Sequence, residues 1–329
     1  MQITASAPTR IDLAGGTIDI WPLYLFHPGA QTLNVAISLR AHARITPRSD
    51  ALVELVSEDT HRQVTLPPDT RLRDDRTLPL LGRLAHHFGA RGLTLTTRGE
   101  SPAGAGIAGS SALNIAVCGA LNAWSQRGLD DEALLAVARD IEAQVIDVPT
   151  GLQDYRPALY GGISAVELRP GATPRVALSV DAHDLQSRLV LCYTGEPRNS
   201  GTNNWDITKR HIDGDRDIRD CFDAIRDTAT AMRAALEASD WDAVARQLAT
   251  EWANRRRLSP GVSTPAIDRL IADATAAGAH AAKVCGAGGG GCLVAMVPPD
   301  RHATVSEALA AGGARLLPFA IEHEGLRVG

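Results

Sequence analysis

The chain has 329 residues, of which 44% are hydrophobic and 22% charged, and its net charge is −5 at pH 7. This composition is typical of a globular protein that can bury one large core or two smaller ones. The negative charge gives no sign of a nucleic-acid partner, and no apolar run approaches the roughly 18 residues of a membrane span. Five scattered cysteines and the lack of an apolar N-terminal leader predict a protein of the reducing cytoplasm.

Strands are expected to come before helices in the N-terminal half, because β-branched residues there partly alternate with polar ones. Later segments have the apolar spacing of helices, and 110–126 is apolar on most sides, as a buried helix would be. The expected strands are 2–7, 32–45, 51–57, 63–66, 93–98, 162–168 and 189–193, and the expected helices are 78–88, 110–126 and 131–147.

The C-terminal half is expected to begin with helices and to end in an alternation of strands and helices. Asp240 is a plausible cap for the second of these helices. A segment rich in proline and glycine, 169–174, is the best domain boundary and divides the chain into 1–170 and 171–329. The expected helices are 218–238, 242–257, 265–277 and 301–311, and the expected strands are 281–285, 292–297 and 316–322, arranged as in a split β-α-β unit.

The segment 102–112, Pro-Ala-Gly-Ala-Gly-Ile-Ala-Gly-Ser-Ser-Ala, carries the strongest chemical signal in the chain. Glycines let backbone N–H groups approach a ligand closely, and the helix that follows points its positive dipole end at the same place. The pattern predicts a loop that binds nucleotide phosphates. The residues assigned to that loop are Pro102, Gly104, Gly106, Gly109, Ser110 and Ser111.

Two other interpretations of this glycine segment stay open. Gly104, Gly106 and Gly109 also satisfy the dinucleotide fingerprint G-x-G-x-x-G. Pro102 interrupts the approach to the loop, however, and the preceding strand candidate alternates as a half-exposed strand would, whereas a dinucleotide site needs a buried strand. A purely structural glycine turn is the second alternative.

Three motifs in order resemble those of the GHMP kinase family, which includes galactokinase, homoserine kinase, mevalonate kinase and phosphomevalonate kinase. They are 7–19 (Ala-Pro-Thr-Arg-Ile-Asp-Leu-Ala-Gly-Gly-Thr-Ile-Asp), the glycine segment 102–112, and 283–292 (Lys-Val-Cys-Gly-Ala-Gly-Gly-Gly-Gly-Cys). The resemblance covers nearly the whole chain. Ala-Gly-Gly in the first motif, together with 150–154 and 193–200, is similar to sugar kinases of the D-glycero-D-manno-heptose 7-phosphate kinase and fucokinase type.

The resemblance implies an α+β fold. Its N-terminal domain would be similar to ribosomal protein S5 domain 2, its C-terminal domain would be ferredoxin-like, and the active site would lie between them. It also implies phosphoryl transfer from ATP, with Mg²⁺, to a hydroxyl of a sugar or sugar phosphate, with heptose 7-phosphate as the leading case. The alternatives are a kinase or decarboxylase of the mevalonate pathway and a non-catalytic nucleotide or sugar sensor. The acceptor and the oligomeric state are not assigned.

The resemblance also assigns catalytic and metal-binding roles. Asp154, in Thr-Gly-Leu-Gln-Asp, matches the carboxylate that receives or orients the acceptor hydroxyl, and Arg10 matches the basic residue that braces it. Ser110 and Ser111 match the hydroxyls, and Glu142 the helix carboxylate, that flank Mg²⁺. The structural alternatives are an Asx turn at Asp154, a surface arginine at Arg10 and a solvated helix carboxylate at Glu142.

Substrate contacts are expected at three further places. Asp19 resembles the acidic residue that holds sugar hydroxyls, although Thr17-Ile18-Asp19 stands where the sugar kinases show Gly-Thr-Asp. Gly288 and Gly289 resemble the third motif, beside the nucleotide, and Gly289 also beside the acceptor. For a phosphorylated acceptor Arg198 is the favoured basic residue, ahead of Lys209, Arg210 and the sequence 255–257. We expect 255–257 to be a solvated helix end.

Overall fold

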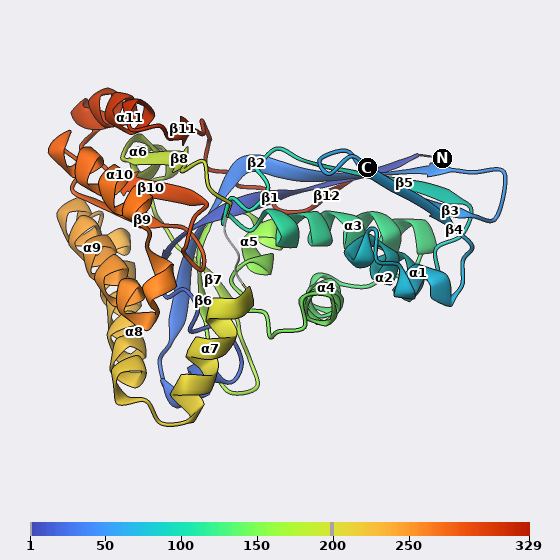
Figure 1. The fold of residues 1–329 in the computed structure, drawn as a ribbon, viewed down its shortest axis with the longest axis horizontal. Helices are drawn as coiled ribbons and strands as arrows, with labels where there is room; N and C mark the ends of the chain where they lie inside the picture. The colour runs from blue at the N-terminus through green and yellow to red at the C-terminus, as the bar shows by residue number, and fades with distance from the viewer. Residues whose placement is uncertain (1, 198–200) are drawn as a thin grey trace.

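The computed structural model describes residues 2–197 and 201–329, which form two β-sheets with helices packed on them (Figure 1). Within these residues no helix is long and apolar enough to cross a membrane. The first sheet has eight strands in the order β12-β1-β2-β5-β3-β4, with β6 on β2 and β7 on β6. Its strands are β1 Ile3–Ala14, β2 Gln31–Pro47, β3 Val53–Ser57, β4 Arg62–Leu66, β5 Leu93–Gly99, β6 Ile163–Glu167, β7 Arg175–Ala177 and β12 Arg327–Val328.

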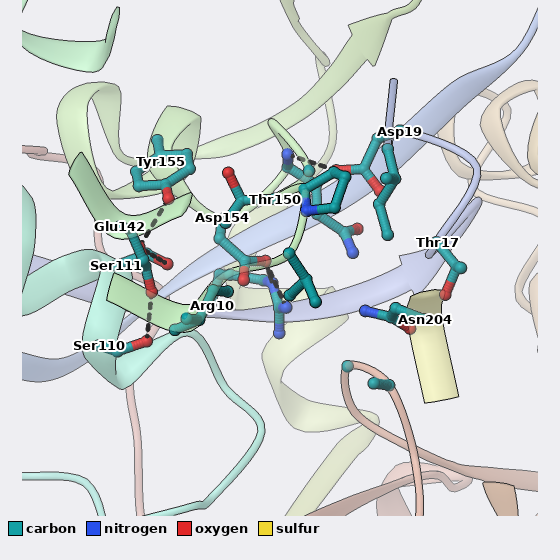
Figure 2. Close-up of a pocket in the computed structure, with 18 residues that line it drawn as sticks. Arg10, Thr17, Asp19, Ser110, Ser111, Glu142, Thr150, Asp154, Tyr155 and Asn204 are labelled. Atoms are coloured by element: carbon teal, nitrogen blue, oxygen red, sulfur yellow. Dashed lines mark hydrogen bonds and ion pairs between the residues drawn. The ribbon is translucent and has the colours of Figure 1, made fainter. Parts of the chain in front are cut away.

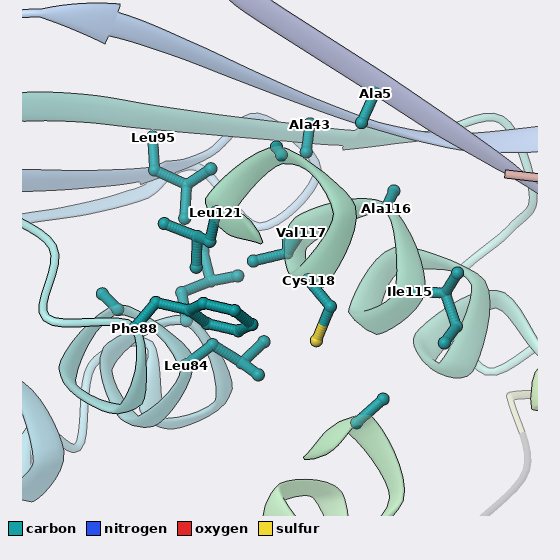
Figure 3. Packing of buried hydrophobic residues seen from close by; sticks show 14 of the residues in the cluster. Ala5, Ala43, Leu84, Phe88, Leu95, Ile115, Ala116, Val117, Cys118 and Leu121 are labelled. Carbon is teal, nitrogen blue, oxygen red and sulfur yellow. The ribbon is translucent and has the colours of Figure 1, made fainter. Parts of the chain in front are cut away.

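One face of the first sheet is covered by helices, as Figure 1 shows. β3 and β5 alternate between buried and partly exposed residues, because only one of their faces packs on the core. Helix α3, Gly109–Ser125, packs its small and aliphatic side chains against the strands and against Leu84 and Phe88 (Figure 3). The helices of this part are α1 Thr70–Asp74, α2 Pro79–His87, α3 Gly109–Ser125, α4 Asp131–Ile146 and α5 Tyr155–Tyr160.

The second sheet has four antiparallel strands in the order β11-β8-β10-β9. Numbered along the chain, this order is 4-1-3-2, and helices follow the first and third strands, so the unit has the ferredoxin-like topology. The strands are β8 Leu189–Tyr193, β9 Ala281–Val284, β10 Cys292–Met296 and β11 Arg315–Leu316. The helices are α6 Ala182–Ser187, α7 Gly201–Ile212, α8 Arg216–Glu237, α9 Trp241–Leu258, α10 Pro265–Ala276 and α11 His302–Ala311, with short 3₁₀ turns η1 Leu23–Phe26, η2 Pro260–Val262 and η3 Pro299–Arg301.

Most of the long predicted elements are confirmed, including α8, α9 and α10, and Asp240 caps α9 by accepting a hydrogen bond from the Ala243 N–H at 2.9 Å. The predicted strand 316–322 is wrong beyond its first residue. The chain there leaves the second sheet and returns to the first, where Ile321 bridges Ile37 and the Ser38 N–H donates to the Ala320 carbonyl. The short helices α1, α5 and α6 and the 12-residue helix α7 were not predicted.

The expected division at residue 170 stays a prediction. The chain does not divide cleanly there, because β7 lies after residue 170 but pairs with β6 of the first sheet. The C-terminal strand β12 also pairs with β1 of the first sheet. Strands of the first sheet therefore come both before and after the four strands of the second sheet in the sequence.

Candidate active site

The glycine loop lies between β5 and α3, and its backbone conformation explains its glycines. Gly104 and Gly106 have φ values of +68° and +76°, a region that disfavours side chains. Ala108 is also left-handed and precedes the first residue of α3. The loop is fixed to β1 by a backbone hydrogen bond of 3.0 Å from the Arg10 N–H to the Ile107 carbonyl. The N-terminus of α3 therefore faces a pocket with Ser110 exposed at its edge.

Glu142 of α4 is bound by hydroxyls from two other elements. Its carboxylate accepts hydrogen bonds from Ser110 Oγ at 3.0 Å and Ser111 Oγ at 3.3 Å. Tyr155 OH donates to Glu142 Oε2 at 2.6 Å. The side chain is only 8% exposed, and burial raises its pKa. Glu142 is therefore not the solvated helix carboxylate of the structural alternative.

Arg10 and Asp154 form a charge-assisted pair at the centre of the pocket (Figure 2). Arg10 Nε and Nη2 donate to Asp154 Oδ1 at 3.0 and 2.5 Å. The arginine is fully buried, and the nearby carboxylates of Asp154 and Asp12 raise its pKa despite the opposing effect of burial. The Asp154 side chain stays 26% exposed, so its carboxylate is open to a ligand while the guanidinium fixes its orientation.

A buried ionic cluster behind Arg10 joins the two sheets. Lys283 Nζ of β9 donates to Asp12 Oδ2 of β1 at 2.8 Å, and the Gly286 N–H donates to Asp12 Oδ1 at 2.8 Å. Burial would raise the pKa of Asp12, but the charges of Lys283, Arg10 and Arg255 outweigh it and hold that pKa at about 2. Asp12 is therefore a permanent carboxylate that links the first motif to the third.

Asp19 is held by the loop that carries Asp154. Its Oδ2 accepts hydrogen bonds from the N–H groups of Leu152 and Gln153 at 2.6 and 2.9 Å. A Cβ at Gly151 would lie 2.0 Å from the same oxygen, so only glycine fits there. Burial raises the pKa of Asp19 to about 6, although the backbone hydrogen bonds oppose this effect. Asp19 and Asp154 thus line one pocket, and the loop that ends at Asp154 is hydrogen-bonded to Asp19.

Comparison with known proteins explains why these residues lie together. The profile of the GHMP kinases N terminal domain matches residues 77–162, and that of the GHMP kinases C terminal matches residues 232–315. Together the two matches cover just over half of the chain, in the same order as in the family. The chain belongs to the GHMP kinase family.

Several GHMP kinases resemble this one along its whole length. The D-glycero-alpha-D-manno-heptose 7-phosphate kinase of Campylobacter jejuni is 28% identical over 335 residues, which cover 99% of this chain and 98% of the relative. The structure of a putative sugar kinase from Campylobacter jejuni is 26% identical, covers 100% of this chain and 98% of its own, and has a TM-score of 0.80. Lactococcus lactis galactokinase complexed with galactose shares the fold, with a TM-score of 0.80 at 18% identity, covering 99% and 95%.

The third GHMP motif packs against the glycine loop through its last glycine. Gly291 has a φ of +85°, and a Cβ there would lie 2.6 Å from the Ala105 carbonyl oxygen. Gly288 and Gly289, which we assigned to the nucleotide, lie against η2 and do not line the pocket. Gly286 and Ala287 line it instead. The predicted roles of Gly288 and Gly289 in contacting ligands stay predictions.

The structure brings six of the predicted GHMP site residues into one pocket. Among the described residues, the pocket lining includes Arg10, Asp19, Ser110, Ser111, Glu142 and Asp154. Pro102, Gly104 and Gly106 lie in the adjoining loop and Gly109 begins α3, and none of the four is part of the lining. Arg198 lies outside the described residues.

The other basic residues considered for a phosphorylated acceptor have protein partners. Lys209 pairs with Asp213 and Arg210 with Asp215. The expectation of a solvated helix end at 255–257 is wrong for Arg255, which is buried and donates to the Gly286 carbonyl at 2.6 Å. Through this hydrogen bond Arg255 holds the backbone of the third motif in place.

Sequence reasoning missed Tyr155, Thr17 and Asn204. Tyr155 follows Asp154 directly, and its contact with Glu142 depends on the unpredicted helix α5. Thr17 is left-handed, with a φ of +73°, an uncommon conformation for a β-branched residue, and it lies near Asn204 at the pocket's edge (Figure 2). Only the position of Thr17 inside the first motif could have indicated it; no local signal marks Asn204.

Proposed function

We propose that this protein is an ATP-dependent kinase that transfers the γ-phosphoryl group to a hydroxyl of a sugar or sugar phosphate. The observation that carries the proposal is the Arg10–Asp154 pair, which faces the hydroxyls of Ser110 and Ser111 across one pocket at the N-terminus of α3. A heptose 7-phosphate is the first acceptor to test, because a full-length relative is named as a kinase of that compound. We propose the cytoplasm as its compartment, because the reaction consumes ATP.

The nucleotide's phosphates are proposed to bind at the glycine loop. The left-handed glycines keep side chains away from the approach, and the helix N-terminus favours negative charge. Ser110 is exposed beside this helix end, and Ser111 lies under it. ATP would therefore be held mostly by backbone groups and the helix dipole. Such binding is sufficient for phosphoryl transfer, in which the protein mainly positions the reactants and forms no covalent bond to them.

Mg²⁺ would be held by Glu142 and the hydroxyls of Ser110 and Ser111, and it would neutralise the charge of the transferring phosphoryl group. The residues fit this ion. Their donors are oxygens only, and the carboxylates of Glu142 and Asp154 face the same pocket, so a cation would relieve their mutual repulsion.

Asp154 is proposed to accept the proton of the acceptor hydroxyl as its oxygen attacks the γ-phosphorus and the bond to the β-phosphate oxygen breaks. Arg10 fixes the carboxylate through two hydrogen bonds to one oxygen, Oδ1, which leaves Oδ2 for the substrate. The same guanidinium places a permanent positive charge where negative charge develops. Asp19 would accept hydrogen bonds from other hydroxyls of the acceptor and align it.

An ATP-consumption screen tests the proposal. The full chain with ATP and Mg²⁺ is offered galactose, fucose, a heptose 7-phosphate and mevalonate, and ADP release and phosphorus NMR of the product are followed. We expect ADP formation with a sugar or sugar phosphate and none with mevalonate, and Asp154→Ala should abolish it. Transfer to mevalonate, or release of carbon dioxide from its diphosphate, would contradict the proposed acceptor class. Nucleotide binding without turnover of any acceptor would indicate a sensor.

A further inference from the structure

A second hollow lies behind the loop that carries Asp154, and arginines from three elements line it. Arg139 comes from α4, Arg156 from α5 and Arg175 from β7. These elements meet near the middle of the molecule (Figure 1). Tyr24 and Tyr160 also line the hollow, and the turn at 171–174 closes one side. The nucleotide loop contributes nothing to this lining.

The charges of this arginine hollow are unbalanced. Among the described residues that line it, three are arginines and one, Glu132, is a carboxylate. Glu132 pairs with Arg156 and also accepts a hydrogen bond from Tyr160 OH at 2.9 Å. Arg139 pairs with Asp140, which lies outside the lining, and Arg175 donates to a neutral acceptor, the Gly161 carbonyl, at 2.8 Å. Among the described residues, Arg175 is thus the one arginine of this lining that pairs with no carboxylate.

Two of the arginines have nitrogen atoms that the protein does not satisfy. In the part of the chain that the structure describes, Nε of Arg156 and Nε of Arg175 are buried without a hydrogen-bond partner. Arg156 is only 5% exposed, and Arg175 stacks over the Tyr160 ring with its guanidinium carbon 5.5 Å from the centroid. Buried donors without partners are rare in native proteins, so these two arginines keep hydrogen-bonding capacity that the protein does not use.

The arginine hollow is linked to the catalytic loop by shared residues. Arg156 is the second residue after Asp154, on the helix that Asp154 begins. Leu152 lines both this hollow and a smaller one beside it, and Asp19 and Thr150 line both the smaller one and the catalytic pocket. An anion held by Arg156 would thus contact the helix that follows Asp154 directly.

We propose that the arginine hollow binds the phosphate group of a phosphorylated small molecule. Arginine suits this ligand, because its planar fork donates two parallel hydrogen bonds to phosphate oxygens and keeps its charge at any physiological pH. The phosphate can come from two sources: the acceptor itself, which rests on the proposed function, or a separate phosphorylated effector that acts through the loop of Asp154. The site takes the same chemistry in both cases.

Binding of inorganic phosphate to the full chain tests the site without any catalytic readout. Titration calorimetry is done with saturating ADP and Mg²⁺, which occupy the nucleotide loop. We expect Arg175→Gln and Arg139→Gln each to weaken phosphate binding at least tenfold. The matched control is Arg169→Gln, an exposed arginine on the nearby turn that pairs with Glu167 and does not line the hollow. Equal affinity in the wild type and in all three variants, with circular dichroism spectra that show each is folded, would overturn the proposal.

Steady-state kinetics then distinguish the two sources. If the acceptor's phosphate binds here, Arg175→Gln raises KM for the phosphorylated acceptor at least tenfold and leaves KM for ATP and for the matching free sugar unchanged. If a separate effector binds here, those KM values stay unchanged, and added phosphate alters kcat of the wild type but not of Arg175→Gln. Arginine-dependent phosphate binding without phosphoryl transfer to any sugar would support the site and remove the proposed function. Normal transfer without such binding would remove the site alone.

Discussion

Asp154 is the residue whose charge we expect to matter most for turnover. Asp154→Asn keeps the size of the side chain but loses the negative charge that accepts the hydroxyl proton and pairs with Arg10. We expect kcat to fall about 10²–10⁴-fold, the usual contribution of a general base, and KM for ATP to change little. Steady-state kinetics measure both, and Asp220→Asn on the exposed face of α8 is the matched control. A folded variant with near-normal kcat would place the base elsewhere.

Glu142 is a proposed ligand of the metal and Tyr155 holds its carboxylate, so we expect substitution of Glu142 to have the larger effect. Glu142→Ala removes a ligand and is expected to raise the Mg²⁺ concentration for half-maximal activity by more than the roughly 10–100-fold typical of losing a residue that only orients a ligand. Tyr155→Phe removes only the 2.6 Å hydrogen bond to the carboxylate and should have a smaller effect of the same sign. Activity measured against Mg²⁺ concentration checks both. An unchanged Mg²⁺ requirement in Glu142→Ala would show that the carboxylate is structural.

If Asp19 holds the acceptor as proposed, we expect acceptor binding to depend on pH. Burial raises its pKa to about 6, and its protonated form cannot accept as many hydroxyl hydrogen bonds. We therefore expect kcat/KM for the acceptor to fall as pH drops below about 6 and to level off above it. Asp19→Asn should remove this step from the profile while the fold persists. A step near pH 6 that survives in Asp19→Asn would belong to another group.

The same shift has a consequence for stability, with the opposite slope. The pKa of Asp19 in the folded protein lies above the value of about 4 in an unfolded chain, so the folded state binds the proton more tightly. The contribution of this carboxyl to the free energy of unfolding is therefore fully present below about pH 4 and decreases as pH rises to about 6. Urea unfolding of wild type and Asp19→Asn across this range isolates that contribution.

At the scale of elements, the third motif decides the position of the nucleotide loop. Gly291→Ala would place a Cβ 2.6 Å from the Ala105 carbonyl oxygen and push the loop away from β10. A shift of about 1 Å in such a site can cost up to about 10²-fold in rate, so we expect kcat/KM for ATP to fall within that limit. Gly313→Ala is the control: its φ of +92° gives the same backbone strain, but no neighbour lies within 4 Å. Equal effects of the two substitutions would show that strain alone is responsible.

At the scale of the whole molecule, the buried pair of Asp12 and Lys283 fastens the second sheet to the first. Lys283→Met leaves the Asp12 carboxylate buried without its main counter-charge, so we expect the free energy of unfolding to fall by about 3–5 kcal/mol. Lys209→Met removes an exposed pair with Asp213 and should change nothing measurable. Urea unfolding of the two variants checks this. A small loss in Lys283→Met would show that Arg10 and Arg255 suffice to balance Asp12.

Much of this protein could be predicted from local patterns. Alternation and helical spacing indicated the long strands and helices, since one covered face imposes a period of 2 or 3.6 residues on the sequence. The three motifs and their resemblance to GHMP kinases placed Arg10, Asp19, Glu142 and Asp154 near one pocket, where the structure has them. The short helix α5 gave no such signal, because six residues cannot establish a period.

Only the tertiary structure decided which polar residues serve the site and which serve the fold. From the sequence alone, residues 255–257 are interpreted as a basic helix end, and Asp12 is one more carboxylate of the first motif. In the folded chain Arg255 and Lys283 come from distant segments to surround Asp12, and their charges hold its pKa low. The hollow of Arg139, Arg156 and Arg175 likewise joins three elements. Local sequence sets the period of each element, whereas the balance of buried charges depends on residues that meet only when the sheets pack together.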